Sequence, residues 1–313
     1  MDSAYSIRAG RRNVDILRPD KPLFGPGVTK LDLASYYEHV ASAMLPHLAR
    51  RPLNLERYPQ GIDGVRIFQQ HAPGHLPAWV RRIQVPGRTG PVEHVSAGDA
   101  ATLVYLAGQA CITFHRWLSR SGVLDRPDLL VIDLDPSTVR PAEIRRAART
   151  IGALLRELGL EPWVMTTGSR GYHVAVALRR HWGFDAVREF AHGLAELAVA
   201  REPGVFTGEQ RKAKREGKIL IDTQRNAYAH SAVSPYAVRA HPDAPVATPL
   251  HWGELEDPKT TAVRWTLASV PDRLERDGDP WKEIASHGQT LTRAQRSLSG
   301  ALAESGVRAG EVA

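Results

Sequence analysis

Two aspartates at the end of an apolar segment are the residues whose type and spacing best suit chemistry. The segment L-L-V-I-D-L-D spans residues 129–135 and ends in Asp133 and Asp135. Side chains alternate faces along a β-strand, so these carboxylates project to the same side, about 6–7 Å apart. Two like charges this close favour a bound cation, and hard divalent cations prefer oxygen ligands. The pair indicates metal-assisted phosphate chemistry, with a helix cap and a solvated strand end as the alternative.

A glycine-rich turn offers the complementary phosphate-binding groups. The stretch T-T-G-S-R-G-Y-H supplies backbone N–H groups, hydroxyls, one fixed positive charge and an imidazole. The side chains concerned are Thr167, Ser169, Arg170 and His173. An ordinary hairpin connection and a structural histidine are the alternative interpretation. A third aspartate, Asp222, ends the strand-like segment K-I-L-I-D-T, and all three segments together would form one nucleotide site.

A cluster of charges precedes Asp222. The run E-Q-R-K-A-K-R-E-G-K, residues 209–218, is typical of a solvated loop and, beside a nucleotide site, also suits contact with a nucleic-acid backbone. The whole chain carries a net charge of +7, which favours a polyanionic partner. The single cysteine, Cys111, excludes an internal disulfide. Neither a signal-peptide core nor an 18-residue apolar stretch occurs, so we expect a soluble, cytoplasmic protein.

The elements that must position these residues predict an α+β fold with a mostly antiparallel sheet. Residues 1–28 suit an extended arm, and a capping box of Thr29 and Asp32 begins a helix that runs towards Pro46. Further helices are expected at 99–120, from Pro141 to Leu158, at 185–201 with Asp185 as N-cap, and at 292–304. Strands are expected at 52–70, 128–135, on both sides of the G-S-R-G turn and at K-I-L-I-D-T.

Several motifs in one order give the chain a family resemblance. They are V-T-K-L-D-L-A-S-Y-Y, M-L-P-H-L-A-R-R-P-L-N-L-E-R-Y-P-Q-G, H-A-P-G-H-L-P-A-W-V, A-T-L-V-Y-L-A-G-Q, V-I-D-L-D-P, T-G-S-R-G-Y-H-V and A-V-S-P-Y-A-V-R-A. From about residue 15 to 282 the chain resembles the polymerase domain of bacterial DNA ligase D, in the archaeo-eukaryotic primase superfamily.

The resemblance implies a primase-type core with an RRM-like mixed or antiparallel sheet, packed with an N-terminal α/β module. Residues 1–290 would form a single catalytic domain, followed by a C-terminal helix and tail at 291–313. Within that domain we expect the module at about 1–125, the core at about 126–240 and a Pro-rich wrap at about 241–290.

The resemblance also assigns roles to residues. Asp133, Asp135 and Asp222 would be the catalytic, metal-binding carboxylates. The incoming triphosphate would be bound by His115, Thr167, Ser169, Arg170, His173 and Arg239. Lys21 and Lys30 match the lysines that bind a DNA 5′-phosphate, with Arg18 where the family usually has asparagine.

The implied activity is template-directed nucleotidyl transfer to DNA 3′ ends at gaps and double-strand breaks, in non-homologous end joining. Ribonucleotides would be preferred, and two Mn²⁺ or Mg²⁺ ions would assist, with NTP or dNTP as substrate. Candidate partners are 5′-phosphorylated DNA ends, Ku and a DNA ligase, and the location would be the cytoplasmic nucleoid. No ligase lysine motif follows residue 290, which suggests a stand-alone polymerase or an excised domain.

Two other functions are compatible with parts of the sequence. In V-I-D-L-D-P-S-T the strand and its aspartates resemble the first motif of haloacid-dehalogenase-type phosphatases, with Ser137 in the fourth motif position. Their later acidic motif is approached only by G-D-P-W-K-E in the Pro-rich tail. A DNA-end-bridging module without catalysis is the second alternative, against which the three retained aspartates argue.

Overall fold

The chain forms two compact units, each with its own β-sheet. The structure, a computed structural model, describes residues 4–25, 27–87, 90–138 and 140–306. The first unit comprises residues 1–122, 231–248 and 265–279, and the second comprises 123–230, 249–264 and 280–313. Residues 231–240, which the sequence groups with the catalytic core, make their contacts within the first unit.

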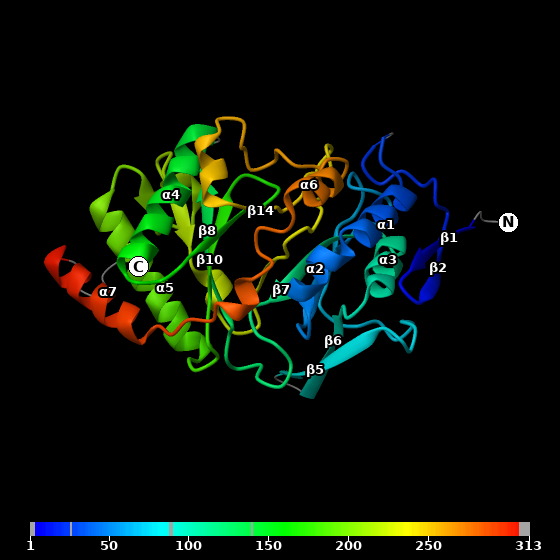
Figure 1. The fold of residues 1–313 in the computed structure, drawn as a ribbon, viewed down its shortest axis with the longest axis horizontal. Helices are drawn as coiled ribbons and strands as arrows, with labels where there is room; N and C mark the ends of the chain where they lie inside the picture. Colours follow the sequence, from blue (N-terminus) through cyan, green and yellow to red (C-terminus); the bar gives the residue numbers. More distant parts are fainter. Residues whose placement is uncertain (1–3, 26, 88–89, 139, 307–313) are drawn as a thin grey trace. The chain divides into compact units, whose positions relative to one another are not determined.

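The first unit combines a hairpin, a sheet and helices (Figure 1). Its strands are β1 (Ala4–Ala9), β2 (Arg12–Leu17), β3 (Leu53–Arg57), β4 (Ile67–Gln69), β5 (Arg81–Gly87), β6 (Gly90–Ser96), β7 (Cys111–Trp117) and β13 (Ser231–Val233). Its helices are α1 (Lys30–His39), α2 (Ala41–Leu48), α3 (Ala100–Gly108) and α6 (Val270–Asp277). The sheet order is β13-β7-β3-β6-β5, with β4 also paired to β3. The strands therefore bring residues distant in sequence, such as those of β3 and β7, side by side.

The start of α1 follows the predicted capping box. The side chain of Thr29 accepts a hydrogen bond from the backbone N–H of Asp32, and the Asp32 carboxylate accepts one from the backbone of Thr29. The predicted helix does not continue unbroken to Pro46, because α1 ends at His39 and α2 begins at Ala41.

The prediction of one helix over residues 99–120 is wrong. Helix α3 ends at Gly108, and Ala110 takes a left-handed conformation with φ of 58°. The following C-I-T-F-H-R-W is rich in β-branched and aromatic residues and forms β7. His115 therefore lies on a strand. The N-terminal arm likewise contains a hairpin, because β1 and β2 pair antiparallel.

The second unit contains a six-stranded sheet in the order β11-β12-β8-β10-β9-β14. Its strands are β8 (Leu129–Pro136), β9 (Trp163–Thr166), β10 (Tyr172–Ala177), β11 (Phe206–Thr207), β12 (Ile219–Asp222) and β14 (Pro249–Leu250). Its helices are α4 (Pro141–Glu157), α5 (Phe184–Arg201) and α7 (Thr292–Glu304). Short 3₁₀ helices are η1 (Lys212–Lys214), η2 (Gln224–Asn226), η3 (Trp252–Glu256) and η4 (Ile284–Ser286). Every pairing except β11 with β12 is antiparallel, so the α+β prediction is confirmed.

Strand β8 has one apolar face and one polar face at its C-terminal end. Ile132 and Leu134 are fully buried, whereas Asp133 and Asp135 on the other face are partly exposed. Helices α4 and α5 pack on β8 and cover apolar surface of the sheet (Figure 1). Helix α4 begins at the predicted Pro141. Helix α5 begins at Phe184, and its N-cap is Gly183, two residues before the predicted Asp185.

None of the helices in the described parts of the chain is long and apolar enough to cross a membrane.

Candidate active site

Three adjacent strands of the second unit place charged side chains in one row. Asp133 on β8 lies directly opposite Asp222 on β12 and directly opposite His173 on β10. Cross-strand partners in antiparallel pairs project to the same face of a sheet. Asp135, two residues after Asp133, shares that face. The structure therefore brings together all three predicted carboxylates and the predicted histidine.

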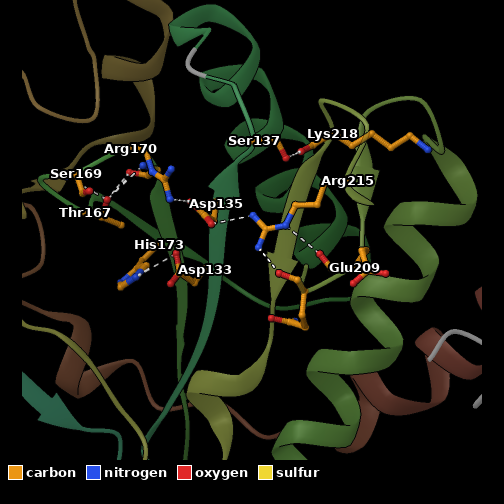
Figure 2. Close-up of polar contacts among 12 residues, drawn as sticks. Asp133, Asp135, Ser137, Thr167, Ser169, Arg170, His173, Glu209, Arg215 and Lys218 are labelled. Atoms are coloured by element: carbon orange, nitrogen blue, oxygen red, sulfur yellow. Dashed lines mark hydrogen bonds and ion pairs between the residues drawn. The ribbon is translucent and has the colours of Figure 1, made fainter. Parts of the chain in front are cut away.

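Two arginines hold Asp135 (Figure 2). Arg170 donates from Nη2 to Oδ1 at 2.9 Å, and Arg215 donates from Nη1 to Oδ2 at 2.9 Å. The Arg215 side chain is only 6% exposed and also donates to the backbone carbonyls of Glu209 and Gln210. The charged run 209–218 is thus anchored to the site by one inward-facing arginine instead of being solvated throughout.

Asp133 is surrounded by positive groups. Arg225 Nε lies 3.3 Å from Oδ2, and His173 Nε2 lies 3.5 Å from Oδ1. Burial raises the pKa of Asp133, but the charges and hydrogen bonds of His173 and Arg225 outweigh it and lower the pKa to about 2. Asp133 is therefore ionised at neutral pH, and its charge is compensated within the unit.

Asp222 has the opposite electrostatic character. Burial raises its pKa, the hydrogen bond from the Gln224 backbone N–H opposes that shift, and the like charges of Asp133 and Asp135 add to it. Because burial is the main cause of the raised pKa, a cation bound at Asp222 would favour its ionised form.

The turn between β9 and β10 has the predicted hairpin geometry. Thr167 donates from its hydroxyl to the carbonyl of Gly171 at 3.0 Å and accepts from the N–H groups of Ser169 and Gly171 at 3.3 Å each. Gly168 has a φ of 63°, in the left-handed region that favours glycine. The Thr167 hydroxyl therefore organises the turn, while Arg170 extends from it to Asp135 (Figure 2).

The donor chemistry of this row suits a hard divalent cation. Three carboxylates on one sheet face supply the oxygen ligands that Mg²⁺ and Mn²⁺ prefer. Among the described residues, no group of three or more His, Cys, Asp or Glu side chains is placed to hold a metal ion as the side chains now lie. Arginine contacts occupy Asp133 and Asp135, so metal binding would require those contacts to open.

The other predicted nucleotide-binding residues belong to the first unit. His115 on β7 lies with Nε2 3.1 Å from Oε1 of Glu56, and Arg239 contributes electrostatically to the same carboxylate. His115 and Arg239 thus share one acidic neighbour. Their placement relative to the carboxylates of the second unit stays a prediction.

Of the predicted 5′-phosphate residues, Arg18 and Lys21 follow β2 and Lys30 is the first residue of α1. The backbone N–H of Lys30 donates to the carbonyl of Lys21, and that of Lys21 donates to the carbonyl of Arg18. Arg18 has a positive φ of 52°. The ammonium of Lys21 donates to the carbonyl of Pro59, and that of Lys30, a residue 6% exposed, donates to the carbonyl of Leu17. Lys30 therefore supports the loop as well as carrying charge.

Sequence reasoning did not single out Arg215 or Glu56. Arg215 lies among several cations in one run, and nothing in that run distinguishes the one that folds inward. Glu56 alternates with Leu53 and Leu55 in a strand pattern whose polar face reads as solvent-exposed. In the structure it is 7% exposed.

Comparison with known proteins points to one family. The model of the LigD primase-polymerase domain matches residues 29–281. The multifunctional non-homologous end joining protein LigD of Pseudomonas aeruginosa is 33% identical over 311 residues, covering 95% of this chain and 36% of the relative. The bifunctional LigD of Bacillus subtilis is 29% identical over 263 residues, covering 83% of this chain and 42% of the relative.

A solved structure has the same fold. The polymerase domain of Mycobacterium tuberculosis ligase D, in complex with DNA, superposes with a TM-score of 0.80 at 29% identity, covering 87% of this chain and 97% of that chain. The chain spans 36% and 42% of the two curated relatives above, so it corresponds to one part of those multifunctional proteins. On the family match and the shared fold, this chain belongs to the LigD primase-polymerase domain family.

Proposed function

We propose that the protein is a template-directed primase-polymerase that adds nucleotides, with ribonucleotides preferred, to DNA 3′ ends at gaps and double-strand breaks. The observation that carries the proposal is the row of Asp133, Asp222 and His173 across three strands, with Asp135 on the same face. The phosphate-binding turn that carries Arg170 adjoins this row. Carboxylates and phosphate donors on one surface suit nucleotidyl transfer, which requires positioning and charge neutralisation and no covalent nucleophile.

The chain's own residues would bind and orient the triphosphate. Arg170 supplies a planar donor suited to phosphate oxygens, and His173 lies beside it on β10. The Thr167 hydroxyl accepts the backbone N–H of Ser169, so Ser169 would contact the triphosphate through its side chain. We assign further triphosphate contacts to His115 and Arg239 of the first unit.

The three aspartates would hold two divalent cations, Mn²⁺ or Mg²⁺. Such ions lower the pKa of a coordinated hydroxyl and neutralise the charge that develops on a transferring phosphoryl group. Arg215 and Arg225 compensate the same carboxylates in the free protein. A bound cation would replace these arginines as the partner of the carboxylates. The carboxylates would then be compensated both in the free protein and in the metal-bound protein.

DNA is the proposed macromolecular substrate. A structural neighbour from the same family is a polymerase domain in complex with DNA, and the net charge of +7 suits a polyanion. Lys21, Lys30 and Arg18 would bind the 5′-phosphate on the far side of a gap. Because the relatives are named for non-homologous end joining, we propose Ku and a DNA ligase as partners and the cytoplasmic nucleoid as the location.

A primer-extension assay tests the proposal. The purified protein is given a gapped duplex with a 5′-phosphate, Mn²⁺ and NTPs, and is compared with Asp133→Asn and Asp135→Asn. We expect extension by the wild type and a loss of at least about 100-fold in each variant, because each removes a carboxylate ligand. The matched control is Asp185→Asn, an exposed aspartate in the first turn of α5, which should extend normally.

The assay also separates the alternatives. Binding of the duplex by the wild type without extension points to a DNA-end-bridging module. Release of phosphate from a monoester, with no extension, points to a phosphatase. Either result contradicts the proposal, as does extension that survives both substitutions in proteins whose thermal unfolding shows an intact fold.

A further inference from the structure

A buried acid–base pair lies on the sheet of the first unit, apart from the carboxylates that the proposed chemistry uses. Strands β3 and β7 pair antiparallel, with Asn54 opposite His115 and Glu56 opposite Thr113. Glu56 and His115 are therefore diagonal neighbours on one face of the sheet. Glu56 Oε1 lies 3.1 Å from His115 Nε2, and the two side chains are 9% and 13% exposed. The contact between Glu56 and His115 is therefore short and mostly shielded from solvent.

Other charged and aromatic groups surround the pair. Arg66 approaches Glu56 Oε1 at 3.8 Å, and Arg239 and Tyr58 interact with Glu56 electrostatically. The edge of the Phe68 ring on β4 packs against the His115 imidazole, with centroids 5.9 Å apart. The pair thus lies between cations on the Glu56 side and an aromatic ring on the His115 side.

The carboxylate of this pair stays ionised despite its burial. Burial raises the pKa of Glu56, but the hydrogen bond and charge of His115, followed by the charges of Arg239 and Arg66, lower it below its usual value. An ionised carboxylate 3.1 Å from an imidazole nitrogen favours the protonated ring, and burial of the ring and the charges of Arg66 and Arg239 act against it. A histidine without such a partner is mostly neutral at pH 7.

We propose that Glu56 is a positioning residue that fixes the His115 ring and keeps it protonated near neutral pH, so that His115 meets an anionic substrate as a cation. The identity of that substrate as a nucleoside triphosphate rests on the proposed function, whereas the pairing itself does not. With Arg66 and Arg239 at the same carboxylate, the group as a whole carries a net positive charge when the His115 ring is protonated. The pair would extend the pH range over which the first unit attracts phosphate.

The pairing is tested without nucleotide by NMR titration of histidine ring signals between pH 5 and 9. The signal of His115 is assigned by its absence in His115→Gln. In Glu56→Gln, which keeps the shape and an acceptor but removes the charge, we expect His115 to lose its proton about one pH unit lower than in the wild type. Glu93→Gln, which removes a half-exposed carboxylate from β6 of the same sheet, should leave the titration unchanged.

The consequence for substrate binding is tested by primer extension at pH 6.0 and 7.5. Glu56→Gln is expected to raise the KM for NTP about fivefold at pH 7.5 and much less at pH 6.0, with little change in kcat. In a His115→Gln background the Glu56 substitution should have no further effect, since its role is exerted through His115.

Three results would overturn the proposal. The first is an unchanged His115 titration in Glu56→Gln. The second is an increase in KM of equal size at both pH values, and the third is an effect that persists in the His115→Gln background. The titration contains no nucleotide, so it decides the pairing even where the wild type fails to extend a primer. Failure of the proposed function and failure of this inference are therefore distinguishable.

Discussion

At the residue scale, the site is an arrangement of balanced charges. Asp133 contacts Arg225 and Asp135 contacts Arg170 and Arg215, while Asp222 accepts a backbone hydrogen bond and has a raised pKa. The two aspartates on β8 could be predicted from the sequence because strand alternation fixes their common face. The arginines that compensate them could not, since the direction of a long charged side chain depends on the tertiary contacts around it.

Gly171 lies where the turn between β9 and β10 approaches the backbone of β8. A Cβ at this position would lie 1.8 Å from the backbone carbonyl oxygen of Leu134 on β8. Because neither backbone can yield without breaking the pairing of β8 with β10, Gly171→Ala is expected to lower the free energy of unfolding by about 3 kcal/mol. It should also abolish primer extension. Chemical denaturation and the extension assay measure the two effects.

The control for Gly171 is Gly253→Ala in η3 of the same unit, where a Cβ meets nothing within 4 Å. That variant should unfold within about 1 kcal/mol of the wild type. Equal stability of Gly171→Ala and Gly253→Ala would show that the backbone of the turn is free to move, against the packing described here.

Lys21 and Lys30 carry the predicted preference for phosphorylated ends. Replacing both with alanine is expected to remove the preference for a 5′-phosphorylated gap, while extension on an unphosphorylated gap stays within about twofold of the wild type. Because Lys30 is buried and donates to the Leu17 carbonyl, the double variant should also melt at lower temperature. Extension is therefore compared below both melting temperatures, and an equal loss on the two substrates would contradict the assignment.

At the element scale, the largest error and the clearest success of the sequence prediction both concern glycines and polar residues at element boundaries. The run at 99–120 carries a boundary signal at Gly108 and Gln109, directly before the left-handed Ala110, and the helix predicted through this signal missed the start of β7. The hairpin of β9 and β10 was predictable because glycines and polar residues interrupt two β-branched segments. Glycines and polar residues between elements, more than hydrophobicity, therefore indicate where one element ends and the next begins.

The loop at 209–218 depends on one side chain for its order. Arg215 contacts Asp135 and also donates to the carbonyls of Glu209 and Gln210, so it ties both ends of the charged run together. Arg215→Gln is expected to increase amide hydrogen exchange across residues 209–218 by about tenfold. Hydrogen-exchange mass spectrometry measures this change peptide by peptide.

A neighbouring exposed cation supplies the comparison. Lys214→Gln removes a positive charge from the same run without removing a buried contact, so its exchange should match that of the wild type. If both variants exchange alike, the loop is ordered by its backbone and not by the Arg215 side chain.

At the scale of the whole molecule, the two units are discontinuous in sequence. The first unit includes residues 231–248 and 265–279, and no linker-like composition in the sequence marks where these segments begin or end. Strand β13 pairs with β7, and the Thr113 hydroxyl donates to the carbonyl of Val238 at 2.7 Å. Contacts of this sequence separation arise from tertiary packing, so the local sequence pattern carries no signal that joins residues 231–240 to the first unit.

A buried histidine makes the stability of the first unit depend on pH. His47 Nε2 lies 3.1 Å from Asp279 Oδ2, which joins α2 to the end of α6 and its following residues. Burial lowers the pKa of His47, the hydrogen bond to Asp279 opposes this, and the charges of Arg116 and Arg51 add to the lowering. In the unfolded chain His47 becomes protonated at about pH 6.5. In the folded protein it becomes protonated only at a lower pH.

Stability should consequently fall as the pH drops below about 6.5, with a contribution from His47 of up to roughly 1.4 kcal/mol per pH unit. His47→Gln, which keeps a donor towards Asp279 but cannot titrate, is expected to remove that part of the slope. Urea denaturation at several pH values from 7.5 to 5.0 measures it. The control is His241→Gln, an exposed histidine of the same unit, which should retain the wild-type slope. Identical slopes for the wild type and His47→Gln would show that the pKa of His47 does not change on folding, against the burial argument.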